Sequence, residues 1–75
     1  MPKAIVLLNA EIGYESDVLR ELRQTESVDE ASLVYGAYDI ILQIQADSMD
    51  ELKQRVTWMI RKMDYVTATQ TMIIL

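Results

Sequence analysis

The chain has 75 residues, 51 % of them hydrophobic, with no cysteine or histidine and a net charge of -5 at pH 7. This length predicts one domain over residues 1–75, and the composition excludes disulfides, thiolate metal sites and catalysis by histidine. The acidic balance argues against direct binding to nucleic acid. Since no apolar run approaches the roughly 20 residues of a membrane span and no charged leader precedes one, we expect a soluble cytoplasmic protein.

The first half of the chain predicts a strand, a helix and a second strand. Residues 3–8 are apolar and rich in strand formers. Residues 15–24 place apolar side chains on one helical face. Residues 28–34 predict the second strand. The apolar face of the helix consists of Val18, Leu19 and Leu22.

The second half predicts a strand, a longer helix and a last strand. Residues 40–45 are the strand, and Ser48 with Glu51 has the spacing of a capping box, which predicts a helix start. Asp64 ends the helix, and residues 65–75 form the last strand. The apolar side chains of this helix recur at steps of three and four and form one stripe. The stripe consists of Met49, Leu52, Val56, Met59, Ile60 and Met63.

The order of these elements predicts an α+β fold of the ferredoxin-like type, βαββαβ, with two helices on one face of a four-stranded antiparallel sheet. An exposed sheet face normally alternates apolar and polar residues, but three of these strands contain continuous apolar runs. The face that the helices leave uncovered therefore carries apolar side chains, and we expect it to pack on a second copy, sheet to sheet. The residues expected there are Ile5, Leu7, Ile41 and Met72.

No catalytic constellation is visible, so we expect no enzyme, cofactor or metal. Ser16 and Ser48 lack a histidine to activate them and are placed at helix starts. Asp47, Asp50 and Glu51 surround a helix start, where capping explains them more simply than metal binding.

The segment between the middle strands is the first candidate binding site. Gly36 and Ala37 allow a close backbone approach, Tyr38 offers a ring with a hydroxyl, and Asp39 can pair with an ammonium group. Plain turn chemistry explains the same residues.

Two further features allow both a functional and a structural interpretation. Thr67, Thr69 and Thr71 lie two apart on the last strand, so their hydroxyls face one side of the sheet. They either line a ligand site or reflect strand preference. Trp58 lies opposite the apolar stripe of its helix and points outward, either as a lone surface aromatic or as an interface anchor.

Residues 28–75 resemble the effector-binding (RAM) domain of the Lrp/AsnC family. The resemblance is carried by the hairpin Gly36-Ala37-Tyr38-Asp39 followed by an apolar strand, and by the spaced threonines of the last strand. The first strand and helix are compatible with it, so it covers essentially the whole chain. The chain is similar to stand-alone members that lack the helix-turn-helix.

The resemblance implies dimers that pair through their sheets and assemble further into octamers or decamers. It also implies a free amino acid bound between dimers by Gly36, Ala37, Tyr38 and Asp39, with Thr69 and Thr71 nearby. Direct DNA binding is not implied. Tyr35 stands where the family often has threonine, which bears on the size of the pocket.

The expected function is therefore an oligomeric amino-acid sensor that modulates transcription indirectly. One alternative is a ligand-free interaction module that pairs with full-length Lrp/AsnC regulators. Another is an ACT-type amino-acid-binding domain, which shares the order of elements.

Overall fold

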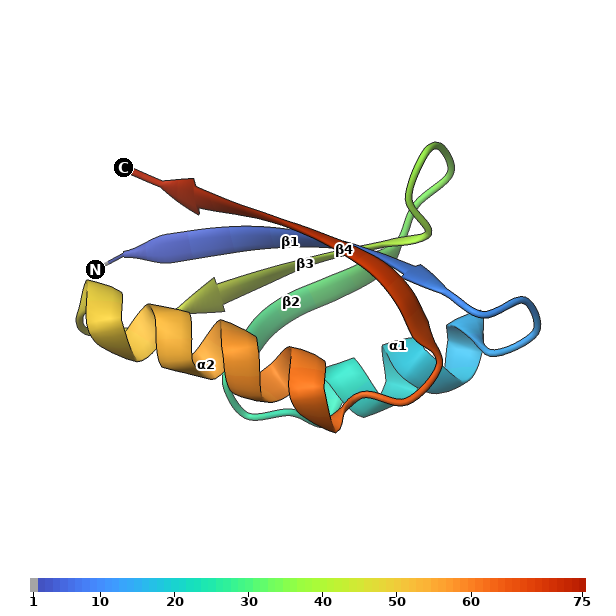
Figure 1. Ribbon diagram of the computed structural model, residues 1–75, viewed down its shortest axis with the longest axis horizontal. Helices are drawn as coiled ribbons and strands as arrows, with labels where there is room; N and C mark the ends of the chain where they lie inside the picture. The colour runs from blue at the N-terminus through green and yellow to red at the C-terminus, as the bar shows by residue number, and fades with distance from the viewer. Residues whose placement is uncertain (1) are drawn as a thin grey trace.

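The computed structural model describes residues 2–75, and its elements follow the predicted βαββαβ order. The strands form one antiparallel sheet in the order β2-β3-β1-β4, and both helices cover the same face of it (Figure 1). The ferredoxin-like α+β prediction is confirmed. The elements are β1 (Lys3–Ala10), α1 (Glu15–Arg23), β2 (Val28–Leu33), β3 (Ile40–Gln45), α2 (Met49–Lys62) and β4 (Val66–Ile74).

The core lies between the sheet and the helices. β1 sits inside the sheet, with β3 and β4 as its neighbours, and every second side chain of β1 is buried. Strand geometry explains this, because successive side chains point to opposite faces. The buried positions of β1 are Ala4, Val6, Leu8 and Ala10, and those of β3 are Ile40, Leu42 and Ile44.

The helices complete the core with the predicted apolar faces. α1 contributes all three of its predicted residues, whereas two residues of the α2 stripe, Met49 and Ile60, are only partly buried at its margin. The buried helical side chains are Val18, Leu19, Leu22, Leu52, Val56 and Met59.

The two helix starts differ from each other. The Ser48 hydroxyl accepts a hydrogen bond from the Glu51 N–H at 3.2 Å, as predicted, while the Glu51 carboxylate accepts from the N–H of Asp47 at 3.3 Å. Ser16 lies at the start of α1, as expected, but it is not the cap. The N-cap position is Tyr14, no side chain within residues 2–75 caps it, and Ser16 lies inside the first turn.

The replacement Ser48→Ala is expected to lower the free energy of unfolding by about 1 kcal/mol, because the Glu51 N–H loses its partner at the N-terminus of α2. Ser16→Ala is the matched control and is expected to change stability by less than about 0.5 kcal/mol. Urea unfolding followed by circular dichroism measures both. Equal losses from the two variants would contradict the assignment of Ser48 as the cap.

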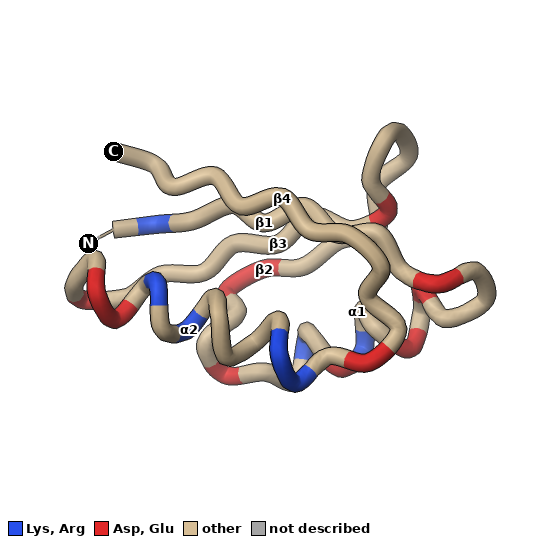
Figure 2. Tube along the Cα trace, in the orientation of Figure 1, with Lys and Arg blue, Asp and Glu red and all other residues tan. Residues whose placement is uncertain are grey.

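The opposite face of the sheet is free of helices, and the predicted apolar residues lie on it. Ile5 is opposite Met72, and Leu7 is opposite Ile41, so the four side chains form one patch. Cross-strand neighbours in an antiparallel sheet lie on the same face. The only charged residue in β1, β3 and β4 is Lys3, at the end of the sheet where the chain begins (Figure 2). We call the patch of Ile5, Leu7, Ile41 and Met72 the free face. Its pairing with a second copy stays a prediction.

Candidate functional site

The β2–β3 connection forms a loop that rises from the sheet on the side away from the helices (Figure 1). Its base is closed by the Val34 N–H, which donates to the Asp39 carbonyl at 2.8 Å. The Asp39 N–H in turn donates to the Leu8 carbonyl at 2.9 Å, which ties the loop to β1. The loop that carries the candidate residues is therefore anchored to β1, a strand in the interior of the sheet.

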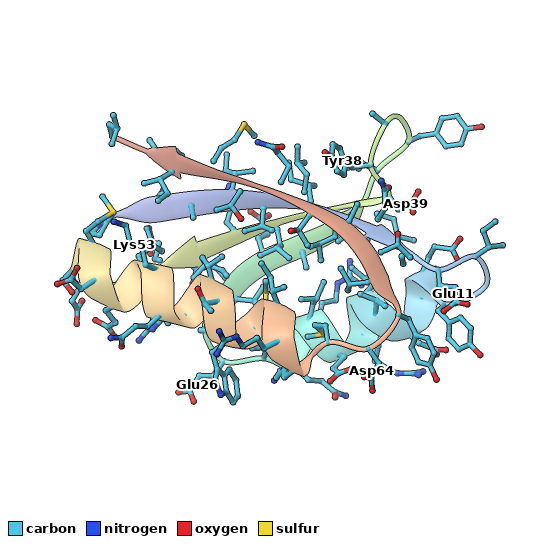
Figure 3. The ribbon with its side chains drawn as sticks, viewed as in Figure 1. Glu11, Glu26, Tyr38, Asp39, Lys53 and Asp64 are labelled. Atoms are coloured by element: carbon cyan, nitrogen blue, oxygen red, sulfur yellow. The ribbon has the colours of Figure 1, made fainter. Side chains whose placement is uncertain are left out.

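The Asp39 side chain strengthens this attachment. Its Oδ2 accepts a hydrogen bond from the Ala10 N–H at 3.2 Å, and the Asn9 side-chain amide donates to the Ala37 carbonyl at 3.3 Å. Figure 3 shows Tyr38 and Asp39 at the base of the loop, close to the sheet. One oxygen of the carboxylate is thus engaged, and within residues 2–75 no hydrogen bond reaches the other oxygen, Oδ1.

The backbone at Gly36 faces open space. A side chain added there would meet no atom within 4 Å, so the glycine leaves room for a ligand beside the loop. Tyr35, whose bulk bears on the size of the pocket, is fully exposed.

Thr69 and Thr71 of β4 lie on the side of the sheet that faces the helices, opposite to the loop. Thr69 is opposite Leu8 and Thr71 is opposite Val6, and both of those β1 residues face the helices. β1 also separates β4 from β3, so Thr69 stands two strands, or about 10 Å, from the start of β3. A single copy of the chain therefore does not bring the loop together with Thr69 and Thr71.

Two features near the site were missed by sequence reasoning. Asn9 supports the loop, and its only signal was a polar residue at the end of an apolar strand. Thr67, which was grouped with the other threonines, donates its hydroxyl to the Asn9 carbonyl at 3.2 Å. This bond fixes β4 to the end of β1 where a register shift occurs.

A pair of stacked tyrosines marks the loops at the same end of the sheet. The rings of Tyr14 and Tyr65 lie 3.8 Å apart at an interplanar angle of 10°. Tyr65 adopts a φ of 67°, a strained value for a residue with a side chain, and its carbonyl accepts from the Glu11 N–H at 2.7 Å. The two loops are joined by this hydrogen bond and the stack, and no local sequence signal connects residues so far apart.

The stack predicts a late tyrosine ionisation. The neighbouring Tyr14 phenol is the main cause that raises the pKa of Tyr65 above its ordinary value of 10.0, followed by desolvation and the Asp64 carboxylate. A raised pKa in the folded state stabilises the fold below the ordinary value, and this contribution is lost as the pH rises through the raised value. Tyrosinate absorbance is expected to show a last step above the ordinary tyrosine value, which we assign to Tyr65. Tyr65→Phe is expected to remove that step, and a profile with the same last step in this variant would contradict the assignment.

Within residues 2–75, no cluster of acidic residues is arranged to hold a metal ion. None of the helices in that range is long and apolar enough to cross a membrane. The order of the elements and the sheet topology describe a small ferredoxin-like domain.

Comparisons with known proteins identify the family. A profile of the Lrp/AsnC ligand binding domain matches residues 3–75. The chain is 30 % identical over 71 residues to PH0140, an uncharacterised HTH-type transcriptional regulator of Pyrococcus horikoshii, a match that covers 95 % of this chain and 45 % of that protein. The crystal structure of the hypothetical protein PHS023 from Pyrococcus horikoshii is 37 % identical, with a TM-score of 0.91 over 100 % of this chain and 90 % of that one.

Two further structures extend the comparison. The crystal structure of FFRP-DM1 has the same 37 % identity and a TM-score of 0.91, and the match covers 100 % of both chains. The L-Met complex of the transcriptional regulator NMB0573 from Neisseria meningitidis is 16 % identical, with a TM-score of 0.81 over 99 % of this chain and 49 % of that one, and shares the fold.

The chain belongs to the Lrp/AsnC family and corresponds to its ligand binding domain, which confirms the family inferred from the hairpin and the threonines. It is therefore a domain of a transcription-regulator family, not of a known enzyme family. The chain spans about half the length of the curated regulators that it matches.

Proposed function

We propose that the chain is an amino-acid sensor of the Lrp/AsnC type, in which copies pair through the free face and bind a free amino acid between pairs. The supporting observation is the division of the candidate residues. The loop residues lie on one side of the sheet and Thr69 and Thr71 on the other, so a site that uses both sets needs more than one copy.

The proposed roles follow from the chemistry of the loop. Backbone N–H groups around Gly36 and Ala37 receive the ligand's carboxylate, since the space beside Gly36 is open. The Asp39 oxygen that takes no hydrogen bond from residues 2–75 receives its ammonium group. Tyr38 packs on the ligand, and the threonine hydroxyls of another copy orient it.

An amino-acid ligand has support among proteins of this fold. The Neisseria meningitidis regulator with the same fold was crystallised as a complex with L-Met. The net charge of -5 gives the chain itself little affinity for DNA, so an effect on transcription is indirect. Since the curated relatives are HTH-type regulators of about twice the length, a full-length relative is the proposed partner.

Calorimetric titration with each of the twenty common amino acids tests the proposal, at protein concentrations where the oligomer is assembled. We expect at least one amino acid to bind. Asp39→Asn retains an oxygen that accepts from the Ala10 N–H but loses the negative charge, so binding is expected to weaken about tenfold. Asp29→Ala, an exposed carboxylate on β2 remote from the loop, is the matched control and should bind as the wild type does.

If no amino acid gives a binding heat while the oligomer is assembled, the proposal that the chain senses amino acids is overturned. Unchanged affinity in Asp39→Asn would move the site away from the loop. The alternative function, a ligand-free module that pairs with a full-length regulator, is favoured if mixed oligomers form with such a regulator and no amino acid binds.

A further inference from the structure

A hollow lies on the helix side of the molecule, away from the loop and from the free face. It has a volume of about 870 Å³ and runs between the α1–β2 connection and one side of α2. Sites for small molecules have volumes of about 300–1,000 Å³, so this hollow is large enough for one. Its lining residues are Gln24, Thr25, Glu26, Ser27, Glu51, Gln54, Arg55, Trp58 and Lys62.

The α2 wall of the hollow is held in place by Arg55. One guanidinium nitrogen pairs with the Glu51 carboxylate at 2.7 Å, and another donates to the Gln45 carbonyl at 2.7 Å. Arg55 is therefore engaged by the protein and neutralises Glu51. The other cation on this wall is Lys62, which pairs with no carboxylate within residues 2–75.

Trp58 forms the ridge between this hollow and a second one. Its side chain is 61 % exposed, and the Lys62 ammonium lies over the indole, 4.8 Å from the ring centroid. A smaller hollow of about 360 Å³ adjoins it, lined by Lys53, Gln54, Thr57, Trp58 and Arg61. Lys62 is itself exposed, so a ligand ring would displace its ammonium from this face of the indole.

The charge of this region is opposite to that of the whole chain. In the range 2–75, the two hollows are lined by four cationic side chains and by the two carboxylates of Glu26 and Glu51, a net charge of +2 against -5 for the chain. Figure 2 shows the cations along α2, and Figure 3 shows Glu26 on the helix side of the molecule. The four cations are Lys53, Arg55, Arg61 and Lys62.

Helix electrostatics explains part of this arrangement. Arg61 and Lys62 lie in the last turn of α2, where positive charge complements the helix dipole. That effect does not account for an indole left exposed between two hollows, since burial of Trp58 would be more favourable. An aromatic group stacked on Trp58 would cover it, and an anionic group on that ligand would meet the cations.

We propose that the Trp58 ridge binds a planar aromatic anion, whose ring replaces the Lys62 ammonium over the indole and whose carboxylate or phosphate pairs with Lys62 and Arg61. The site is separate from the loop and does not rest on the amino-acid proposal. Both halves of the ligand are required, because exposed stacking and exposed ion pairing are each weak alone.

The test uses the emission of Trp58, which is the only tryptophan of the chain. Benzoate and phenyl phosphate are the probes, with benzamide as the ring without charge and acetate as the charge without ring. We expect a saturable emission change with at least one of the two anionic probes and none with the controls. The tighter of the two probes identifies a carboxylate or a phosphate as the natural anionic group.

Two variants locate the binding. Lys62→Gln is expected to lower the affinity for the anionic probe about threefold to fivefold. Two controls are expected to leave this affinity unchanged. They are Lys3→Gln, which removes the same charge at the end of the sheet, and Asp39→Asn in the loop. Equal effects of benzoate and benzamide, or of Lys62→Gln and Lys3→Gln, would overturn the proposal. An emission that depends on protein concentration and not on the probes would also overturn it, and would make the ridge a contact between copies.

Discussion

Leu8→Ala is expected to lower the free energy of unfolding by about 3 kcal/mol. Leu8 is 1 % exposed, and it stands in the core between Ile40 on β3 and Thr69 on β4. Truncation removes buried methyl groups and leaves a cavity that the two neighbouring strands cannot close without losing their register. In a domain of this size, whose total stability is about 5–10 kcal/mol, this is a large fraction of the whole.

Leu7→Ala is the matched control, because the same residue type is truncated one position away on the opposite face. Urea unfolding at two protein concentrations separates the two variants. The effect of Leu8→Ala is expected to be nearly the same at both concentrations, whereas that of Leu7→Ala appears only where copies are paired. Equal, concentration-independent losses from the two variants would contradict the assignment of β1 side chains to a core face and a free face.

Leu7→Glu is expected to weaken the pairing of copies by a factor of about one hundred or more. Leu7 lies in the middle of the free face, opposite Ile41 on one side and Gln70 on the other. A carboxylate at this position has no cation near it, since Lys3 is the one charged residue of β1, β3 and β4. Burying such a charge in an interface costs several kcal/mol, while leaving it exposed in a monomer costs little.

Sedimentation velocity over a range of protein concentrations measures this change. Ser16→Glu adds the same charge on an exposed position of α1 and is expected to leave the association unaffected. A wild-type chain that sediments as a monomer at every concentration would refute the pairing outright, and with it the proposed site between pairs. A Leu7→Glu variant that still pairs would place the interface on another surface.

The order and type of the elements follow from sequence because each has its own local pattern. The predicted first strand stops at Leu8, but β1 continues to Ala10, because Asn9 and Ala10 gain their strand conformation from pairing with β4. That partner lies at the other end of the chain, so no local pattern reports it. Likewise, Ser16 has the chemistry of a cap, but the loop geometry places Tyr14 at the cap position.

The candidate loop was also predictable as a set of neighbours, since Gly36 to Asp39 are adjacent in the chain. Its support by Asn9 and Ala10, and its position on the opposite side from Thr69, depend on how strands pair and were not predictable. The outward direction of Trp58 followed from helical periodicity. The hollow beside it did not, because its other wall comes from the connection after α1.

The apolar character of both faces of β1 has a consequence for folding. In most strands, a shift of pairing by one residue is strongly disfavoured because polar side chains enter the core. In β1, such a shift would place Ile5 and Leu7 where Val6 and Leu8 belong, an exchange of similar side chains. The penalty therefore falls on the ends of the strand, where Lys3 and Asn9 would be driven inward. Two polar residues, together with the hydrogen bond from Ala10 to Asp39, decide between the correct pairing and a misfolded one.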